Sequence, residues 1–264
     1  MKNLDNENII HIVKNDIEIL QFRELLKFPN LIHGYTLKKH GFSIGRTDEQ
    51  VLKNSYKKIS NFFGIDESSI VQPYQSHTDN VEIVNSKTDN LKDVDGVITD
   101  KQDILLATTT ADCIALLFFD KSTNVIANVH SGWRGTVKKI GKKAVQKMIA
   151  VYGLKPENII CCICPSIRKC HFEVDEDVME IFKNEFEYTG RIAEIISKGD
   201  IKNGKQKYFV DTVLINKIML EEAGLKAENI IDSGICTVCH SDEFHSHRAN
   251  GIQAGRNGAF IGMC

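Results

Sequence analysis

Short apolar runs bounded by turn residues dominate the first half of the chain, and they predict strands. The runs are rich in Val, Ile, Thr and Phe, and each is too short for a helix. Strands are therefore predicted at residues 9–13, 17–22, 70–71, 81–84, 96–99, 104–109, 114–119 and 125–129. The last of these strands leads directly into His130.

The spacing of apolar residues lengthens beyond Gly135, where it becomes typical of a helix. Apolar side chains from Val137 to Met148 recur every three or four positions and so lie on one helical face. Thr136 can cap this helix, and Gly153 can end it. Further helices are predicted at 175–186 and 212–223, further strands at 159–163, 230–235 and 259–263, and a surface loop at 197–206. With no internal repeat or linker, this order predicts a single α/β domain over residues 1–264, with mixed sheets and outer helices.

Composition places the chain among ordinary globular proteins. Apolar residues make up 42% and charged residues 26%, which argues against disorder. The net charge of −2 provides no basic surface for nucleic acid. No apolar run approaches the ~20 residues that cross a bilayer, and the N-terminus lacks the pattern of a signal peptide. We therefore expect a cytoplasmic protein that binds neither nucleic acid nor membrane, with its eight cysteines mostly reduced.

Three residues at the ends of predicted strands carry the side chains of a zinc site. His77 precedes one strand, Cys113 begins the strand at Ile114, and His130 ends another. Two imidazoles and one thiolate suit zinc and leave a fourth position for water, whose pKa falls towards ~7 in such a site. The spacing matches no local metal motif. From these residues alone, hydrogen-bonded structural histidines and a core cysteine remain an alternative interpretation.

A series of short sequence blocks is spaced from about Leu31 to Met263. In chain order the blocks are His33-Gly34, Gln75-Ser76-His77, Asp95 to Thr99, Thr110-Ala111-Asp112-Cys113, His130 to Gly135, Cys164 to Ile167, Phe172-Glu173-Val174, Cys236-Thr237, Ser246-His247-Arg248 and Gly255-Arg256. Together they resemble the laccase-domain, or multicopper polyphenol oxidoreductase-like, family, which is associated with purine nucleoside phosphorylase activity. The His-x-Gly-Trp-Arg-Gly block is highly specific.

This resemblance implies a fold, a metal and a reaction. It implies a layered α/β sandwich like the catalytic domain of the cytotoxic necrotizing factor toxins, with zinc bound by His77, Cys113 and His130. It also implies phosphorolysis of adenosine, inosine, guanosine and methylthioadenosine, and deamination of adenosine. Purine nucleosides and phosphate are therefore the expected partners, and no oligomeric state is predicted. Copper could occupy the same ligands, because copper binds such sites more tightly than zinc does.

Other polar residues of these blocks are candidates for catalysis or substrate binding. Arg134, near the start of a predicted helix, could hold a phosphate or ribose oxygen, or could instead pack on Trp133. Asp112 could act as a base, hydrogen-bond a metal ligand or stabilise a turn. Anion binding is also predicted for Lys38, Arg248 and Arg256.

The segment from Thr36 to Ser43 departs from the family pattern. Lys38 stands where the family has an arginine, His40 stands where it has a glycine, and the Ser-Leu-Asn that usually follows is missing. Lysine lacks the planar fork of arginine, so anion recognition there should be weaker. Near the end of the chain, His247 replaces one of two paired arginines. These departures concern substrate range and rate more than the metal.

Four cysteines form two C-x-x-C pairs. Cys161 and Cys164 make the first pair, which lies in and just after an apolar strand, and Cys236 and Cys239 make the second. The four could hold a second zinc, or they could be buried reduced thiols.

Three rival functions remain open at this point. A copper-dependent polyphenol oxidase needs several coppers and repeated H-x-H pairs, whereas the chain has nine histidines and one such pair, His245 and His247. We expect these two to be pocket or surface residues. A cysteine hydrolase would use Cys113 as its nucleophile, activated by His130 or His77. A partner-binding protein that merely retains a zinc is the third.

Overall fold

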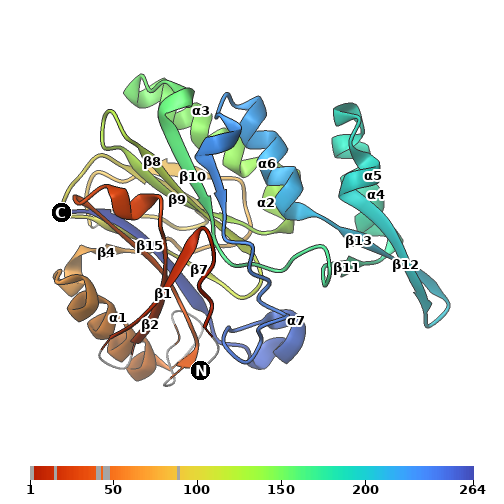
Figure 1. Cartoon of the computed structure of the whole chain (residues 1–264), viewed down its shortest axis with the longest axis horizontal. Coiled ribbons are helices and arrows are strands. Elements are labelled where there is room, and N and C mark those ends of the chain that lie inside the picture. The colour runs from red at the N-terminus through yellow and green to blue at the C-terminus, as the bar shows by residue number, and fades with distance from the viewer. Residues whose placement is uncertain (1–2, 15–16, 40–42, 44–47, 88–89) are drawn as a thin grey trace.

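Two six-stranded mixed sheets form the centre of the molecule (Figure 1), a computed structural model that describes residues 3–14, 17–39, 43, 48–87 and 90–264. The first sheet has the order β1 (Ile9–Lys14), β2 (Ile17–Phe22), β3 (Leu31–Thr36), β15 (Asn257–Met263), β7 (Leu105–Thr110) and β4 (Ile70–Val71). The second has the order β14 (Ile230–Asp232), β10 (Ile159–Ile163), β8 (Ile114–Asp120), β9 (Ile126–Ser131), β6 (Gly96–Thr99) and β5 (Val81–Ile83).

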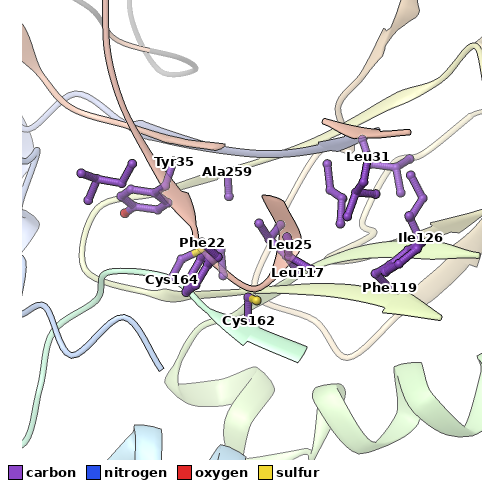
Figure 2. Close-up of a cluster of buried hydrophobic side chains, with 14 of the residues drawn as sticks. Phe22, Leu25, Leu31, Tyr35, Leu117, Phe119, Ile126, Cys162, Cys164 and Ala259 are labelled. Atoms are coloured by element: carbon purple, nitrogen blue, oxygen red, sulfur yellow. The ribbon is translucent and has the colours of Figure 1, made fainter. Parts of the chain in front are cut away.

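The main hydrophobic core lies between the facing surfaces of these two sheets. Phe22 and Tyr35 of the first sheet and Leu117, Phe119 and Cys162 of the second are all buried in it, and Figure 2 shows their side chains between the two layers of strands. Burial of this apolar surface stabilises the fold by roughly 25 cal/mol per Å². The core therefore holds the two sheets together.

Strand β8 is apolar from Ile114 to Phe119 because both of its faces are covered. Leu117 and Phe119 face the other sheet, whereas Leu116 and Phe118 belong to a second buried cluster. In that cluster α3 (Ile140–Tyr152) and α6 (Thr212–Glu222) cover the second sheet, and α1 (Glu49–Phe63) covers the outer face of the first. The result is a sandwich of four layers, with helices outside.

A smaller sheet projects from one end of this sandwich (Figure 1). Its strands are β11 (Glu173–Val174), β13 (Lys205–Val210) and β12 (Ile196–Lys202), and it is accompanied by α4 (Glu176–Phe186) and α5 (Ile192–Ile195). Phe182 and Phe186 of α4 share a buried cluster with Ile215 and Met219 of α6. The remaining helices are α2 (Trp133–Val137), α7 (His247–Asn250) and the single turns Leu25–Lys27, Glu67–Ser69, Pro156–Asn158, Glu187–Thr189, Ala227–Asn229 and Gly251–Gln253.

The predicted α/β architecture of mixed sheets and outer helices is confirmed. The extent of a single domain and the likeness to the cytotoxic necrotizing factor domain stay predictions. Strand β3 and helix α1 were not predicted. Part of the altered family segment, His40 and residues 44–46, lies outside the described residues. Among the described residues, no helix has the length and apolar character needed to cross a membrane.

Two local predictions are wrong. Residues 197–206 are not a loop but part of the β12–β13 hairpin, which turns at Asn203 and Gly204 with positive φ at both. The helix expected through Val137 and Met148 is broken, because Lys139 has φ +61 and separates α2 from α3. Thr136 does not cap a helix but lies inside α2.

A buried histidine in β3 connects the second and third strands. The Nε2 atom of His33 accepts a hydrogen bond of 2.8 Å from the backbone N–H of Phe22, and its carbonyl accepts one from the side chain of Gln21. The next residue, Gly34, approaches β2 so closely that a Cβ there would lie 2.5 Å from Ile19 Cγ2. Burial lowers the pKa of His33 from 6.5 to about 3, so the folded protein holds this ring neutral.

His33 should therefore make the free energy of unfolding depend on pH. Below pH 6.5 the unfolded chain binds a proton that folded His33 does not, so stability should fall as pH decreases from 6.5 towards 3. The contribution approaches about 1.4 kcal/mol per pH unit. Urea unfolding of the parent and of His33→Gln across this range should show a shallower slope for the variant. Equal slopes for parent and His33→Gln would contradict the assignment.

Candidate metal centre and active site

Three predicted ligands converge at one end of the second sheet. Cys113 immediately precedes β8, and His130 lies near the end of β9, paired with Ala115 of β8. His77 lies in the turn before β5 with a left-handed φ of +63. The ligand atoms of the three residues all lie within 4.8 Å of one another, and Cys113 Sγ is 3.9 Å from His77 Nε2. The structure thus brings the predicted triad together.

A buried carboxylate orients both histidines. Asp95, just before β6, accepts a hydrogen bond of 2.7 Å from Nδ1 of His130 and one of 3.1 Å from the backbone N–H of His77. Its other oxygen accepts two bonds of 2.7 Å from the backbone and hydroxyl of Thr78. Because Nδ1 of His130 donates to Asp95, Nε2 is the atom that would bind a metal. Burial lowers the pKa of His130, but the charge of Cys113 and the bond to Asp95 raise it to about 9, so a metal would displace the proton on Nε2.

The charges of this group favour a bound cation. Burial raises the pKa of Asp95, but hydrogen bonds from His130 and Thr78 bring it down to about 2. Burial also raises the pKa of the Cys113 thiol, yet the charge of His130 and hydrogen bonds from both histidines lower it to about 6. Cys113 is therefore readily available as a thiolate, the form that binds metals.

The backbone of Gly132 packs directly against one side of the triad. A Cβ at Gly132 would lie 2.8 Å from Cδ2 of His77 and 3.4 Å from both Cys113 Sγ and His130 Cε1. A side chain at this position would push the ligands apart. Two nitrogen donors and one sulfur donor, packed directly against backbone, fit the preference of zinc for mixed nitrogen and sulfur ligands.

The triad lies in the wall of a cavity of about 930 Å³, which is large enough for a nucleoside. Its apolar lining includes Trp133, Ile167, Phe172, Val174 and Val178. Its polar lining includes Gln75, Thr109, Thr110, Arg134, Glu173, Asp177, His247, Arg248 and Arg256. Three guanidinium groups thus share one cavity with the candidate metal ligands.

The predicted anion-binding residues divide into two groups. Arg134 lies in the cavity wall with its guanidinium 4.3 Å from the centre of the Trp133 ring, so it packs on Trp133, and its role in holding a phosphate or ribose oxygen stays a prediction. Arg248 and Arg256 also lie in the wall. Lys38 does not, and its ammonium donates instead to the carbonyl of Ser241.

Asp112 connects the triad to the C-terminal part of the chain. Its buried carboxylate accepts hydrogen bonds of 2.6 Å from Thr237 Oγ1, 3.1 Å from Ser246 Oγ and 2.7 Å from the backbone N–H of Arg248. None of these donors is a metal ligand, so the arrangement favours the structural role of Asp112 over that of a base or of a hydrogen-bond partner to a metal ligand. Asp112 therefore positions the segment that carries Arg248 next to Cys113.

The alternative in which the four cysteines hold one zinc ion is wrong, and Cys161 and Cys164 are buried thiols. Cys161 is buried on the helix-covered face of the second sheet, and Cys164 is buried between the sheets. Cys236 and Cys239 lie instead beside Cys170, which the sequence did not single out, and beside its neighbour His171.

Asp95 is the residue of the candidate site whose role the sequence did not reveal. It begins a recognised block, yet nothing local marked it as the partner of His130, which lies on another strand. The available signal was an acidic residue directly before a fully buried strand, because a buried carboxylate requires hydrogen-bond donors.

Comparison with known proteins places this site in a family. Residues 34–264 match the family model described as multi-copper polyphenol oxidoreductase laccase. The purine nucleoside phosphorylase YlmD of Bacillus subtilis is 30% identical over 257 residues, covering 88% of each chain. An adenosine deaminase, RL5, from an unknown prokaryotic organism is 31% identical over 202 residues, covering 73% of this chain and 74% of that protein.

A solved structure agrees with this sequence relationship. The crystal structure of the hypothetical protein YfiH of Bacillus licheniformis superposes with a TM-score of 0.82 at 26% identity, covering 96% of this chain and 99% of that one. The similarity thus extends through both sheets and the smaller sheet. The chain belongs to the multi-copper polyphenol oxidoreductase laccase family.

Proposed function

We propose that this protein is a zinc-dependent enzyme of purine nucleosides. It would cleave adenosine, inosine, guanosine and methylthioadenosine with phosphate, and deaminate adenosine. The observation that carries this proposal is the convergence of His77, Cys113 and His130 in the wall of a cavity that also contains three arginines. The names of the relatives, purine nucleoside phosphorylase and adenosine deaminase, support the substrate class.

The side chains around the triad would hold a metal ion at one position, with its ligands in a fixed geometry. A zinc ion bound by His77, Cys113 and His130 would supply Lewis-acid chemistry beside the substrate. Asp95 fixes the tautomer of His130 and the turn that carries His77, and Gly132 lets backbone pack against all three ligands. Copper could occupy the same ligands.

The cavity offers separate surfaces for a base and for an anion. Phe172 and Val178 provide apolar contact for a planar purine. Arg134 provides a guanidinium whose paired N–H donors match a phosphate, and Arg248, which donates to the carbonyls of His171 and Glu173, adds positive charge beside it. Arg248 lies with its guanidinium 5.9 Å from the centre of the Phe172 ring, so the two surfaces adjoin.

A copper oxidase of polyphenols fits the described residues poorly. Reduction of oxygen to water needs several coppers with many histidine ligands. Within the described ranges, two groups of side chains could bind a metal. The triad contains two histidines, and the group around Cys170 contains one, His171. His11 and His33 are committed elsewhere, to the side chain of Glu18 and the backbone of Phe22.

A cysteine hydrolase remains the second candidate, on one specific observation. The pKa of Cys113 is held at about 6 against the effect of burial, chiefly by His130, and a lowered thiol pKa is also what a nucleophilic cysteine requires. Metal content separates the two functions, because a thiolate that coordinates zinc is a poor free nucleophile.

Removing the thiolate ligand should abolish both zinc binding at the triad and nucleoside turnover. Cys113→Ala should contain one equivalent of zinc fewer than the parent and lose at least roughly 10³-fold in kcat/KM for adenosine. Zinc analysis and product identification, with and without phosphate, measure both effects. Cys162→Ala, which removes a thiol from the core, should retain zinc and activity. A zinc-loaded parent that leaves all four nucleosides unchanged would show the proposal to be wrong.

Weakening the hydrogen bond between Asp95 and His130 should reduce the affinity for metal without removing a ligand. Asp95→Asn replaces the carboxylate that accepts from Nδ1 of His130 by a neutral amide, so zinc affinity should fall roughly 10- to 100-fold. Competition with a chelator measures this affinity. Asp93→Asn, on a nearby carboxylate that bonds the Ser76 hydroxyl, is the matched control. Equal affinity in the Asp95 variant and the parent would exclude the positioning role.

Replacing Arg134 by lysine should weaken the binding of phosphate more than the binding of the nucleoside. Arg134→Lys keeps the charge but loses the planar fork, so KM for phosphate should rise about 10-fold, the equivalent of about 1.4 kcal/mol. Phosphate-independent deamination should be unchanged. Arg191→Lys, at an exposed arginine paired with Glu194, controls for the exchange. An unchanged KM for phosphate would remove Arg134 from the phosphate site.

A further inference from the structure

A second group of metal-ligating side chains lies outside the triad. It consists of Cys170 and His171, which follow β10, and Cys236 and Cys239, which follow β14. One ligand atom from each residue lies within 4.8 Å of every other. Cys236 is buried, whereas Cys170 and Cys239 are exposed, so an ion could enter from solvent.

The distances within this group match a tetrahedral zinc site. With Zn–S bonds of about 2.3 Å and Zn–N bonds of about 2.0 Å, tetrahedral geometry places sulfurs about 3.8 Å apart and sulfur and nitrogen about 3.5 Å apart. Cys170 Sγ lies 3.7 Å from Cys236 Sγ and 3.9 Å from Cys239 Sγ. Nδ1 of His171 lies 3.2, 3.7 and 3.5 Å from the sulfurs of Cys170, Cys236 and Cys239.

A disulfide explains this arrangement less well. Bonded sulfurs lie about 2.05 Å apart, whereas the sulfur of Cys170 is about equally far from two others. A single disulfide would leave one thiol and the imidazole of His171 unexplained at the same point. Four donors around one centre are the arrangement that a metal ion requires.

The two segments that carry the ligands are held in place independently of any ion. Cys170 and His171 lie in a turn closed by the bond from the His171 N–H to the Arg168 carbonyl, and Cys236 begins a second turn. A parallel bridge joins Ser166 to Cys236, and Arg168 makes a bidentate ion pair of 2.6 and 2.9 Å with Asp232. The ligands are thus preorganised by the fold.

We propose that Cys170, His171, Cys236 and Cys239 bind a zinc ion as a closed, structural Cys₃His site. All four coordination positions come from the protein, which distinguishes it from the triad with its open position. This proposal is independent of the function proposed for the triad.

A zinc ion at this second site would stabilise part of the wall of the cavity beside the triad. Thr237, next to Cys236, donates to the carboxylate of Asp112, the neighbour of Cys113. The guanidinium of Arg248 donates to the carbonyls of His171 and Glu173 at 2.6 and 3.1 Å. A zinc ion at the second site would therefore fix the backbone that positions both Asp112 and Arg248.

Zinc analysis of the full chain tests the proposal, because each site can be removed separately. The double variant Cys170→Ser/Cys239→Ser should contain one zinc ion per chain fewer than the parent, and its Tm should be lower by roughly 5 °C or more. Cys264→Ser, at another exposed cysteine, should retain the parent's zinc content and Tm. The same zinc content in parent and double variant would overturn the proposal.

Cobalt provides a readout that does not require the double variant to fold. Cys113→Ala loaded with Co²⁺ leaves only the second site, which should give the intense thiolate-to-cobalt absorption of a tetrahedral three-sulfur site. A cobalt spectrum without that absorption would overturn the proposal. So would peptide mapping without reductant that finds Cys170 disulfide-bonded to Cys236 or Cys239.

Discussion

The candidate site depends on the burial of one negative charge. Asp95 is fully buried, and an ionised carboxylate away from water costs several kcal/mol unless donors surround it. Its donors come from the turn at residues 76–78 and from His130 at the end of β9, so satisfying the charge requires both segments to adopt their observed positions. The same hydrogen bonds explain why His77 tolerates a left-handed backbone. The hydrogen bonds that compensate the buried charge of Asp95 thus also set the positions of His77 and His130.

A second buried carboxylate repeats this logic on the other side of Cys113. Like His77, Asp112 has a positive φ. Its carboxylate oxygens accept hydrogen bonds from Thr237, Ser246 and the backbone of Arg248. Asp95 therefore orients the metal ligands, whereas Asp112 brings in the C-terminal segment that completes the cavity. Both acids lie at the same end of the second sheet, where strands β6 and β8 begin and strand β9 ends.

Secondary structure can be predicted from the sequence where the local apolar pattern of a segment agrees with its burial. Strands such as β8 are apolar on both faces and could be predicted from composition alone, whereas the β12–β13 hairpin is largely polar and was missed despite the turn signal at Asn203 and Gly204. The triad was predictable because its blocks are specific. Cys170 was not, because its partner Cys236 is 66 residues away and they meet only through the pairing of β10 with β14.

The position of β15 constrains the order in which the chain can fold. Residues 257–263 form an interior strand of the first sheet, inserted between β3 and β7, and they are also part of the core between the sheets. Until they are synthesised, β3 and β7 each lack the strand that joins them, and Ala259, Ile261 and Met263 are missing from the core. Such long-range pairing is slow and leaves apolar surface open to aggregation. The first sheet can therefore be completed only after β15 has been synthesised.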